Sequence, residues 1–323
     1  MKKRLTTSVV PLPTELASLH TVTADPWVQI NPPWILEGPS FDRKGNLYLC
    51  LLGFGLPDAS GGKILKVSPD KMVTTVYEDS NLYFTSTAFH KDGRLFCCTI
   101  TPQGLSQIVY MNPDGSNMTP VTASYDGKPY AADGMCFDTQ GNLYVADVAG
   151  DINGPVGGVY KYSAPDYTKV TPILTNLAGA NGISFADSGR GDGSGVLWVS
   201  ETYPNRIIRV ALTAAGTIQP SGIRMLNLSQ GIAGPDGNTV DASGNLYQTM
   251  ADQGRVVVLN PEGLFIANIL APGRDEGKLL MTYNLAFKPG TSEGYLVTST
   301  FGSESWILRF QGLAKGATLF ANQ

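Results

Sequence analysis

Three observations on this sequence predict an all-β protein, a six-bladed β-propeller with four antiparallel strands per blade. The 323-residue chain contains 37 Gly and 21 Pro but only 15% charged residues, a balance typical of turn-rich β proteins. A similar segment recurs about every fifty residues, six times in all. Each segment contains enough short apolar runs, separated by turns, for the four strands of one blade.

The repeat is clearest at a turn between the first two strands of each blade. An apolar residue, a polar turn and an aromatic or aliphatic strand follow one another around Gly45, Gly93, Gly141, Gly195, Gly244 and Gly294. The turn often begins with Asp, which can hydrogen-bond the backbone of the turn while Gly adopts a positive φ. Fifty residues of sheet cannot bury a core alone. We therefore expect one domain over residues 1–323, with an extended segment over 1–19 and blades from about residue 34.

Closure of the propeller requires a strand from outside the six repeats. A segment within His20–Val28 is the candidate to pair into the last blade, although its periodicity is weak. A closed ring of this kind has a central channel along its axis.

Composition argues against several classes of function. The 23 basic and 27 acidic residues give a net charge of −4, without the positive patch that a nucleic-acid-binding protein needs. No apolar run is long enough to cross a membrane, and the amino terminus is too polar for a secretory signal, so we expect a cytoplasmic protein. The chain has only two histidines, His20 and His90, which makes a histidine-based catalytic triad improbable. Four cysteines lack CxxC spacing and are interpreted as small core residues: Cys50, Cys97, Cys98 and Cys136.

The repeat also places six oxygen-bearing side chains around the propeller axis. The first strand of each blade lies next to that axis. Four residues before the apolar residue of each turn, these strands carry Glu37, Thr85, Asp133, Asn181, Asp236 and Tyr283. Three carboxylates near one axis cannot all stay ionised without a positive charge among them. Oxygen ligands without Cys or His suit Ca²⁺. The sequence therefore predicts a calcium site formed by Glu37, Asp133, Asn181 and Asp236.

Glycine follows each of these four residues, as Gly38, Gly134, Gly182 and Gly237. A missing side chain at these places either leaves room for a ligand or lets the backbone approach closely. A cation with open positions can polarise a carbonyl or phosphoryl oxygen while a neighbouring carboxylate accepts a proton. Thr85, Tyr283 and Tyr203 are candidates to contact a substrate, although Tyr is also common in propeller strands. These residues predict metal-assisted hydrolysis.

Several stretches resemble the senescence marker protein, gluconolactonase and luciferin-regenerating enzyme family, most of all its staphylococcal lactonases. They include His90–Phe96, Ala180–Ile183 and Pro272–Gly277, and the resemblance extends from about Trp34 to Phe320. It implies a six-bladed propeller and Ca²⁺-dependent hydrolysis of lactones.

The resemblance implies that three residues are metal ligands, as at the matching positions of the family. They are Glu37, which stands before Gly-Pro, Asn181, which lies in Asn-Gly, and Asp236, which lies in Pro-Asp-Gly. The resemblance also implies that Asp236 is the acid/base. Relatives often carry Asn at the third-blade position, where this chain has Asp133, which adds a negative charge to the site.

The resemblance bears on the substrate and on a second ion. Many gluconolactonases carry a sugar-binding Arg where this chain has Ala131, so an apolar or aromatic lactone is expected in preference to a sugar lactone. The expected mechanism is attack on a Ca²⁺-bound lactone carbonyl by a water that Asp236, or Asp133, deprotonates. The resemblance to the staphylococcal lactonases implies a second, structural Ca²⁺ near the third blade. Asp126 is a candidate ligand for it, although the sequence around Asp126 differs from that of the staphylococcal enzymes.

Two alternatives to a lactonase remain open at this point. The ligand pattern also resembles the squid-type phosphofluoridate hydrolase, so a phosphotriester hydrolase is the first alternative. A propeller that binds a partner without chemistry is the second, because a fold does not dictate function. The expected partner is a small lactone, with no nucleic acid and no membrane, and the sequence does not predict an oligomeric state.

Overall fold

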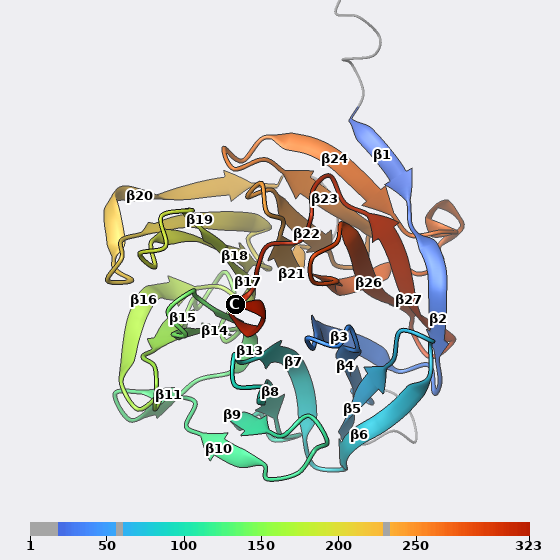
Figure 1. Ribbon diagram of the computed structural model, residues 1–323, viewed down its shortest axis with the longest axis horizontal. Helices are drawn as coiled ribbons and strands as arrows, with labels where there is room; N and C mark the ends of the chain where they lie inside the picture. Colours follow the sequence, from blue (N-terminus) through green and yellow to red (C-terminus); the bar gives the residue numbers. More distant parts are fainter. Residues whose placement is uncertain (1–18, 56–60, 229–232) are drawn as a thin grey trace, which may run out of the picture.

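The computed structural model describes residues 19–55, 61–228 and 233–323, and it confirms the predicted six-bladed β-propeller. Six four-stranded antiparallel blades form a ring (Figure 1). Helical structure in the described residues is limited to two short 3₁₀ turns, Arg274–Glu276 and Phe320–Asn322. No helix in these residues has the length and apolar character that a membrane span requires.

The strands of each blade run outward from the axis in chain order, apart from the outermost strand of the last blade. Blade one contains β3 (Ile35–Phe41), β4 (Leu47–Leu52), β5 (Gly62–Val67) and β6 (Val73–Asp79). Blade two contains β7 (Tyr83–Phe89), β8 (Leu95–Ile100), β9 (Ser106–Met111) and β10 (Thr119–Val121). Blade three contains β13 (Ala132–Phe137), β14 (Leu143–Asp147), β15 (Gly157–Tyr162) and β16 (Val170–Leu177). A small hairpin, β11 (Ser124–Tyr125) with β12 (Lys128–Pro129), joins blades two and three.

The other three blades follow the same plan. Blade four contains β17 (Ala180–Asp187), β18 (Gly195–Glu201), β19 (Arg206–Leu212) and β20 (Ile218–Asn227). Blade five contains β21 (Pro235–Val240), β22 (Leu246–Met250), β23 (Arg255–Leu259) and β24 (Phe265–Leu270). Blade six contains β25 (Met281–Phe287), β26 (Glu293–Thr300) and β27 (Glu304–Gln311). Apolar side chains of neighbouring blades pack between the sheets and form the core, as where Val145 of blade three shares a cluster with Phe96 of blade two.

In the turn between the first two strands of a blade, Asp hydrogen-bonds the backbone and Gly has a positive φ, as predicted. Asp42 accepts hydrogen bonds from the backbone N–H groups of Lys44 and Asn46 at 2.9 and 2.8 Å, and Gly45 has a φ of 79°. Asp138 and Asp241 bind their own turns in the same way. These carboxylates, of which Asp138 and Asp241 are buried, fix the turn and therefore the register of the first two strands.

The amino-terminal segment closes the ring, as the prediction for His20–Val28 requires. β2 (Asp25–Ile30) pairs antiparallel with β27 and becomes the outermost strand of the sixth blade. Just before it, β1 (His20–Thr23) adds a parallel strand to β24 at the outer edge of the fifth blade. Residues 1–18 of the expected extended segment lie outside the described residues.

The carboxyl-terminal segment lies across one end of the channel, where Figure 1 shows the chain end near the centre of the ring. Gly316 bridges to Asp241, and the carbonyl of Ala321 accepts a hydrogen bond from Arg43. Both partners lie in the first hairpin turns of their blades. This end of the channel is therefore covered, and the opposite end, where the inner strands begin, is the mouth.

Candidate functional site

The six predicted axial residues all lie on the innermost strands near the mouth. Each of these strands has a register shift at this point, between Glu37 and Ser40 in β3 for example, and between Pro235 and Asn238 in β21. Equivalent shifts occur in β7, β13, β17 and β25. Bulges re-aim side chains and are common beside active sites. The shared bulge is therefore the backbone device that positions the axial residues.

Hydrogen bonds from neighbouring strands hold these bulges in place. Glu37 Oε2 accepts from the backbone N–H of Gly38 at 2.9 Å and from Asn284 Nδ2 of the adjacent blade at 3.2 Å. The carbonyl of Asp133 accepts from Thr85 Oγ1 at 3.3 Å and from Ser86 Oγ. Glu37 and Asp133 are thus each tied to the blade beside them.

Asp236 is fixed through its backbone by second strands of two blades. Its carbonyl accepts hydrogen bonds from Ser200 Oγ of β18 at 2.6 Å and from Gln248 Nε2 of β22 at 2.8 Å. Thr249 Oγ1 lies 2.8 Å from the carbonyl of Gly237 and 2.8 Å from that of Tyr283. Ser200, Gln248 and Thr249 lie on second strands, outside the repeat position that carries the axial residues, so the repeat does not predict them.

The close approach of the inner strands explains the glycines that follow four axial residues. A Cβ on Gly134 would come closer than 3.0 Å to the carbonyl of Asn181, and one on Gly182 would meet the carbonyl of Asp236. Of the two interpretations offered by the sequence, close backbone approach therefore applies. In the other two blades the equivalent residues are Ser86 and Asn284, whose side chains hydrogen-bond Asp133 and Glu37.

Burial raises the pKa values of the three axial carboxyl groups, and repulsion between them adds to the shift at Glu37 and Asp236. Burial, reinforced by the negative charge of Asp133, raises the pKa of Glu37 to about 8, against the hydrogen bonds from Gly38 and Asn284. Burial raises the pKa of Asp133 to about 6, opposed by a hydrogen bond from Thr85. The pKa of Asp236 is raised well above its usual range by burial and then by the charges of Glu37 and Asp133. No Lys, Arg or His within the described ranges forms an ion pair with these groups.

This donor set has the chemistry of a site for a hard divalent cation. Three carboxylates and the Asn181 amide supply only oxygen, and the carboxylates lack a positive partner. In the described parts of the chain, no three or more His, Cys, Asp and Glu side chains lie close enough together to hold a metal ion. The donor types therefore fit a cation, while the carboxylates stand farther apart than the ligands of a bound ion.

The candidate substrate-contacting residues lie at different depths. Thr85 belongs to the axial ring, and Tyr283 is half-buried beside Asp252, which hydrogen-bonds it and contributes after burial to raising its pKa. Tyr203 is 58% exposed in the loop after β18 and packs over Gly179. Asp252 follows β22 at the mouth and was not identified from the sequence, because it lies in a loop without repeat periodicity.

Apolar side chains gather at the mouth on the side of blades one, two and six. The Phe54 ring, in the loop after β4, lies 5.6 Å from the Tyr83 ring at the start of β7. Phe301, in the loop after β26, lies against Gly55. Phe54 and Phe301 are more than half exposed. This apolar wall, defined as Phe54, Tyr83 and Phe301, borders the entrance to the axial ring.

Asp126, the candidate ligand for a second ion, lies in a tight turn. It joins β11 to β12 with a φ of 50°, followed by Gly127 at 72°. Two successive positive φ values are typical of a type I′ hairpin turn. The structure thus gives Asp126 a local conformational role, and it shows no group of acidic side chains for an ion here within the described ranges.

Comparisons with known proteins give a consistent family and fold. The sequence pattern of the SMP-30/Gluconolactonase/LRE-like region matches residues 38–152 and 149–277. Lactonase drp35 of Staphylococcus saprophyticus is 37% identical over 315 residues, which cover 96% of this chain and 93% of that protein.

Solved structures share the fold at lower sequence identity. A gluconolactonase candidate superposes with a TM-score of 0.70 at 22% identity, covering 94% of this chain and 97% of the other. Regucalcin of Agrobacterium tumefaciens, described as a calcium-binding protein, has a TM-score of 0.67 at 17% identity and covers 92% and 98%. At these identities the structural likeness establishes the propeller fold alone.

We expect the metal-free protein to lose stability as the pH rises from about 4 to 8. The folded-state pKa values of Glu37 and Asp133 lie above their ordinary values of 4.5 and 3.8, so folding favours the protonated forms. Their stabilising contribution is complete below the ordinary values and is lost as the pH rises through about 6 for Asp133 and about 8 for Glu37. After chelator treatment the melting temperature should be lower at pH 8 than at about pH 5, and Glu37→Gln should flatten the decline. A melting temperature that rises over this interval would contradict the assignment.

Adding one methyl group between two inner strands should damage the site. Gly182→Ala places a Cβ against the Asp236 carbonyl, so we expect a loss of roughly 1–3 kcal/mol in the free energy of unfolding. Gly154→Ala is the matched control, because Gly154 has open space around the added Cβ. Denaturant unfolding of both variants measures the difference, and equal stability of the two would show that the strands are less tightly packed than described.

Proposed function

The chain belongs to the SMP-30/gluconolactonase/LRE-like family, and from this membership and the axial ring we propose that it is a hydrolase that opens the ester ring of lactones. The observation that carries the proposal is a set of three carboxylates, one buried (Asp236) and two half-buried (Glu37 and Asp133), with one amide around the propeller axis and without a cationic partner among the described residues. Lactonase drp35, which matches nearly the whole chain, supports the same reaction class.

Calcium is the cofactor that we propose for this site. Glu37, Asp133, Asn181 and Asp236 would hold it, and it would neutralise carboxylates that otherwise raise one another's pKa. The carboxylates stand apart in the structure, so binding would draw them toward the axis. When bound, such an ion supplies Lewis-acid polarisation of an ester carbonyl.

The residues of the chain provide the proton transfer. Asp236, on a bulge fixed by Ser200 and Gln248, accepts a proton from water as the water oxygen bonds to the acyl carbon. The bond between the acyl carbon and the ring oxygen then breaks, and the same carboxyl returns its proton to that oxygen. The product is a hydroxy acid. Asp133, whose pKa of about 6 lies near neutrality, is the second candidate for this role.

The substrates that suit this site are apolar or aromatic lactones. Tyr83 and the exposed rings of Phe54 and Phe301 offer apolar surface beside the entrance. Ala131, which precedes β13 at the mouth, offers no hydrogen bond through its side chain to a sugar hydroxyl. A polyhydroxylated lactone would therefore lose hydration at the wall without gaining matching partners.

Hydrolysis of dihydrocoumarin and of a γ-lactone by chelator-treated protein tests the proposal. We expect added Ca²⁺ to restore turnover, Glu37→Gln to weaken Ca²⁺ binding, and Asp236→Asn to reduce kcat by about 100-fold or more while Ca²⁺ still binds. Asp114→Asn, at an exposed turn carboxylate, is the control and should leave activity unchanged. Full activity of Asp236→Asn would remove Asp236 from the acid/base role. Calcium binding without lactone turnover would instead favour the phosphotriester hydrolase.

Selectivity for apolar lactones should depend on the apolar wall. Phe301→Ala should raise KM for dihydrocoumarin by about 3–10-fold, because apolar contact with the bound ring is lost, and should change KM for unsubstituted γ-butyrolactone little. Phe265→Ala, at an exposed ring on the outer strand of blade five, is the matched control. Equal effects of Phe301→Ala on both substrates would argue against the wall as a selectivity element.

A further inference from the structure

Two buried carboxyl groups near the mouth take no part in the proposed reaction. Asp147 and Glu201 are the last residues of β14 and β18, and their exposed fractions are 2% and 1%. Each pairs across the sheet with the residue that precedes an axial ligand candidate, Asp133 in blade three and Asn181 in blade four. In the other four blades the equivalent position carries residues without a carboxyl group: Leu51, Thr99, Met250 and Thr298. A carboxyl group at this position is therefore a feature of blades three and four.

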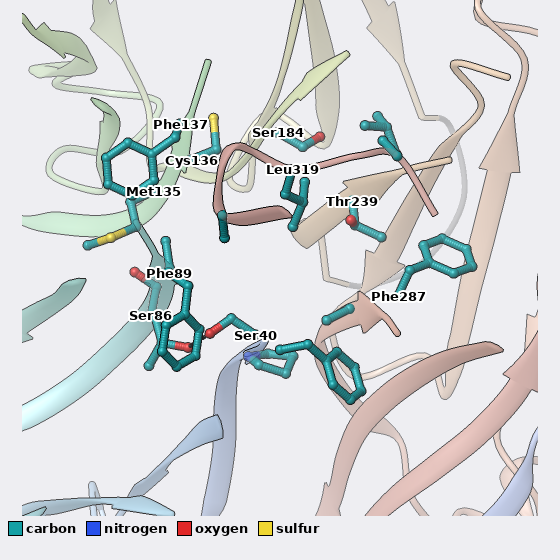
Figure 2. Close-up of a pocket in the computed structure, with 18 of the residues that line it drawn as sticks. Ser40, Ser86, Phe89, Met135, Cys136, Phe137, Ser184, Thr239, Phe287 and Leu319 are labelled. Carbon is teal, nitrogen blue, oxygen red and sulfur yellow. Dashed lines mark hydrogen bonds between the residues drawn. The ribbon is translucent and has the colours of Figure 1, made fainter. Parts of the chain in front are cut away.

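The bulges interrupt the pairing of these two inner strands close to the mouth. Toward the covered end, β13 resumes its pairing with β14 at Met135, and β17 resumes its pairing with β18 at Ile183. Figure 2 shows Met135 and Ser184, from these regular parts of the two strands, on the wall of the channel. Toward the mouth, a single residue pair remains in each blade before the axial residue. Pairing between the strands therefore gives little hold on the backbone that aims Asp133 and Asn181.

The carboxylate of Asp147 adds two hydrogen bonds at this point. Its Oδ1 atom accepts from the backbone N–H of Ala131, two residues before Asp133, at 2.9 Å and from that of Ala149, in the loop after β14, at 3.1 Å. Burial raises the pKa of Asp147 and both hydrogen bonds oppose the rise, so they stabilise the ionised group. No Lys, Arg or His in the described ranges forms an ion pair with Asp147. The carboxylate and the two N–H groups therefore depend on one another.

Glu201 makes the equivalent contact in blade four. Its Oε1 atom accepts from the backbone N–H of Ala178, three residues before Asn181, at 2.7 Å. Its Oε2 atom forms an ion pair with Arg206, the first residue of β19. Because this ion pair fixes one oxygen, the other stays directed at Ala178. Both buried carboxyl groups thus hold the backbone that leads into a ligand candidate.

Backbone hydrogen bonds join these two contacts into one network. The carbonyl of Ala149 accepts from the N–H of Gly179 at 3.4 Å, and the carbonyl of Gly179 accepts from the N–H of Thr202 at 2.9 Å. Gly179 follows Ala178 in the chain, and Thr202 follows Glu201. The segments that enter blades three and four are therefore fixed to each other as well as to their own sheets. Fixing two of the four donors before an ion arrives lowers the cost of ordering the site.

We propose that Asp147 and Glu201 are positioning residues for the cation site, and that they hold Asp133 and Asn181 as a preformed half of the axial donor set. The inference rests on the proposed function, because it assigns the axial donors to a bound cation. Groups that orient the ligands of a metal contribute about 10–100-fold to its affinity. Asp147 and Glu201 act through the backbone of the ligand strands and are not catalytic residues.

Calorimetric titration of the full-length protein with Ca²⁺ tests the proposal. Asp147→Ala leaves the N–H groups of Ala131 and Ala149 without their acceptor, so we expect the affinity for Ca²⁺ to fall about 10-fold or more. Asp138→Ala is the matched control, because Asp138 is also 2% exposed and also binds two backbone N–H groups, at the other end of the same blade. Both variants should lower the melting temperature, and only Asp147→Ala should weaken Ca²⁺ binding.

Conservative variants show whether the hydrogen bonds are responsible. Asp147→Asn keeps an oxygen that can accept from both N–H groups, so we expect its affinity for Ca²⁺ to stay within about threefold of the wild type. Glu201→Ala should weaken Ca²⁺ binding as Asp147→Ala does, and Glu201→Gln should restore most of the affinity. If Asp147→Ala does not fold, the Glu201 pair of variants carries the same test.

Hydrogen exchange of the metal-free protein tests the positioning without any ion. A peptide that contains residues 131–135 should exchange its backbone N–H groups faster in Asp147→Ala than in the wild type, because the segment has lost its anchor. The same peptide should exchange at the wild-type rate in Asp138→Ala. Mass spectrometry after short exposure to deuterated water measures both.

The outcomes separate this inference from the proposed function. An Asp147→Ala protein that loses stability as the control does, but keeps its Ca²⁺ affinity within about twofold of the wild type, would overturn the inference even if the enzyme hydrolyses lactones. Unchanged exchange of residues 131–135 would overturn it as well. A wild-type protein that binds Ca²⁺ but hydrolyses no lactone would count against the proposed function alone, and a loss of affinity in Asp147→Ala would still support the inference. A wild-type protein that binds no Ca²⁺ would overturn both.

Discussion

The crowding of six inner strands around one axis is the constraint on which the rest of this structure depends. The strands approach so closely that a Cβ on Gly134 or Gly182 would meet the backbone of the next blade. A bulge in every strand meets this constraint and at the same time aims the axial side chains. Where Ser86 and Asn284 replace glycine, their side chains become hydrogen-bond donors to the adjacent blade. Packing and site geometry therefore have one origin.

The same convergence creates an electrostatic conflict at the axis. Burial raises the pKa values of Glu37, Asp133 and Asp236, and neighbouring negative charges raise those of Glu37 and Asp236 further, so ionising all three groups without a cation among them is unfavourable. A fold optimised for stability alone would not place three carboxylates there. Such violations of local rules are typical of functional sites. A ligand that neutralises the ring would join function to stability, because it binds the folded chain preferentially.

The sequence predicted those features that repeat and did not predict those that join one repeat to another. Periodicity was enough for the six blades, the Asp42-type turns and the axial positions, and the closing strand was located within His20–Val28. The hydrogen bond from Asn284 to Glu37 crosses between blades, and Gln248 acts from a second strand. The terminal segment over the channel has no repeat at all.

Closure of the ring by β2 also has a consequence for the order of events during synthesis. Gln29 pairs with Trp306, so two strands that complete one sheet are translated almost 280 residues apart. The strand β2 is therefore synthesised early but has no partner on either edge until β27 has been made, nearly 280 residues later. Contacts of such sequence separation are slow to form, and unpaired edges promote association between chains. The sixth blade is thus the step at which nascent chains are most exposed to misassembly.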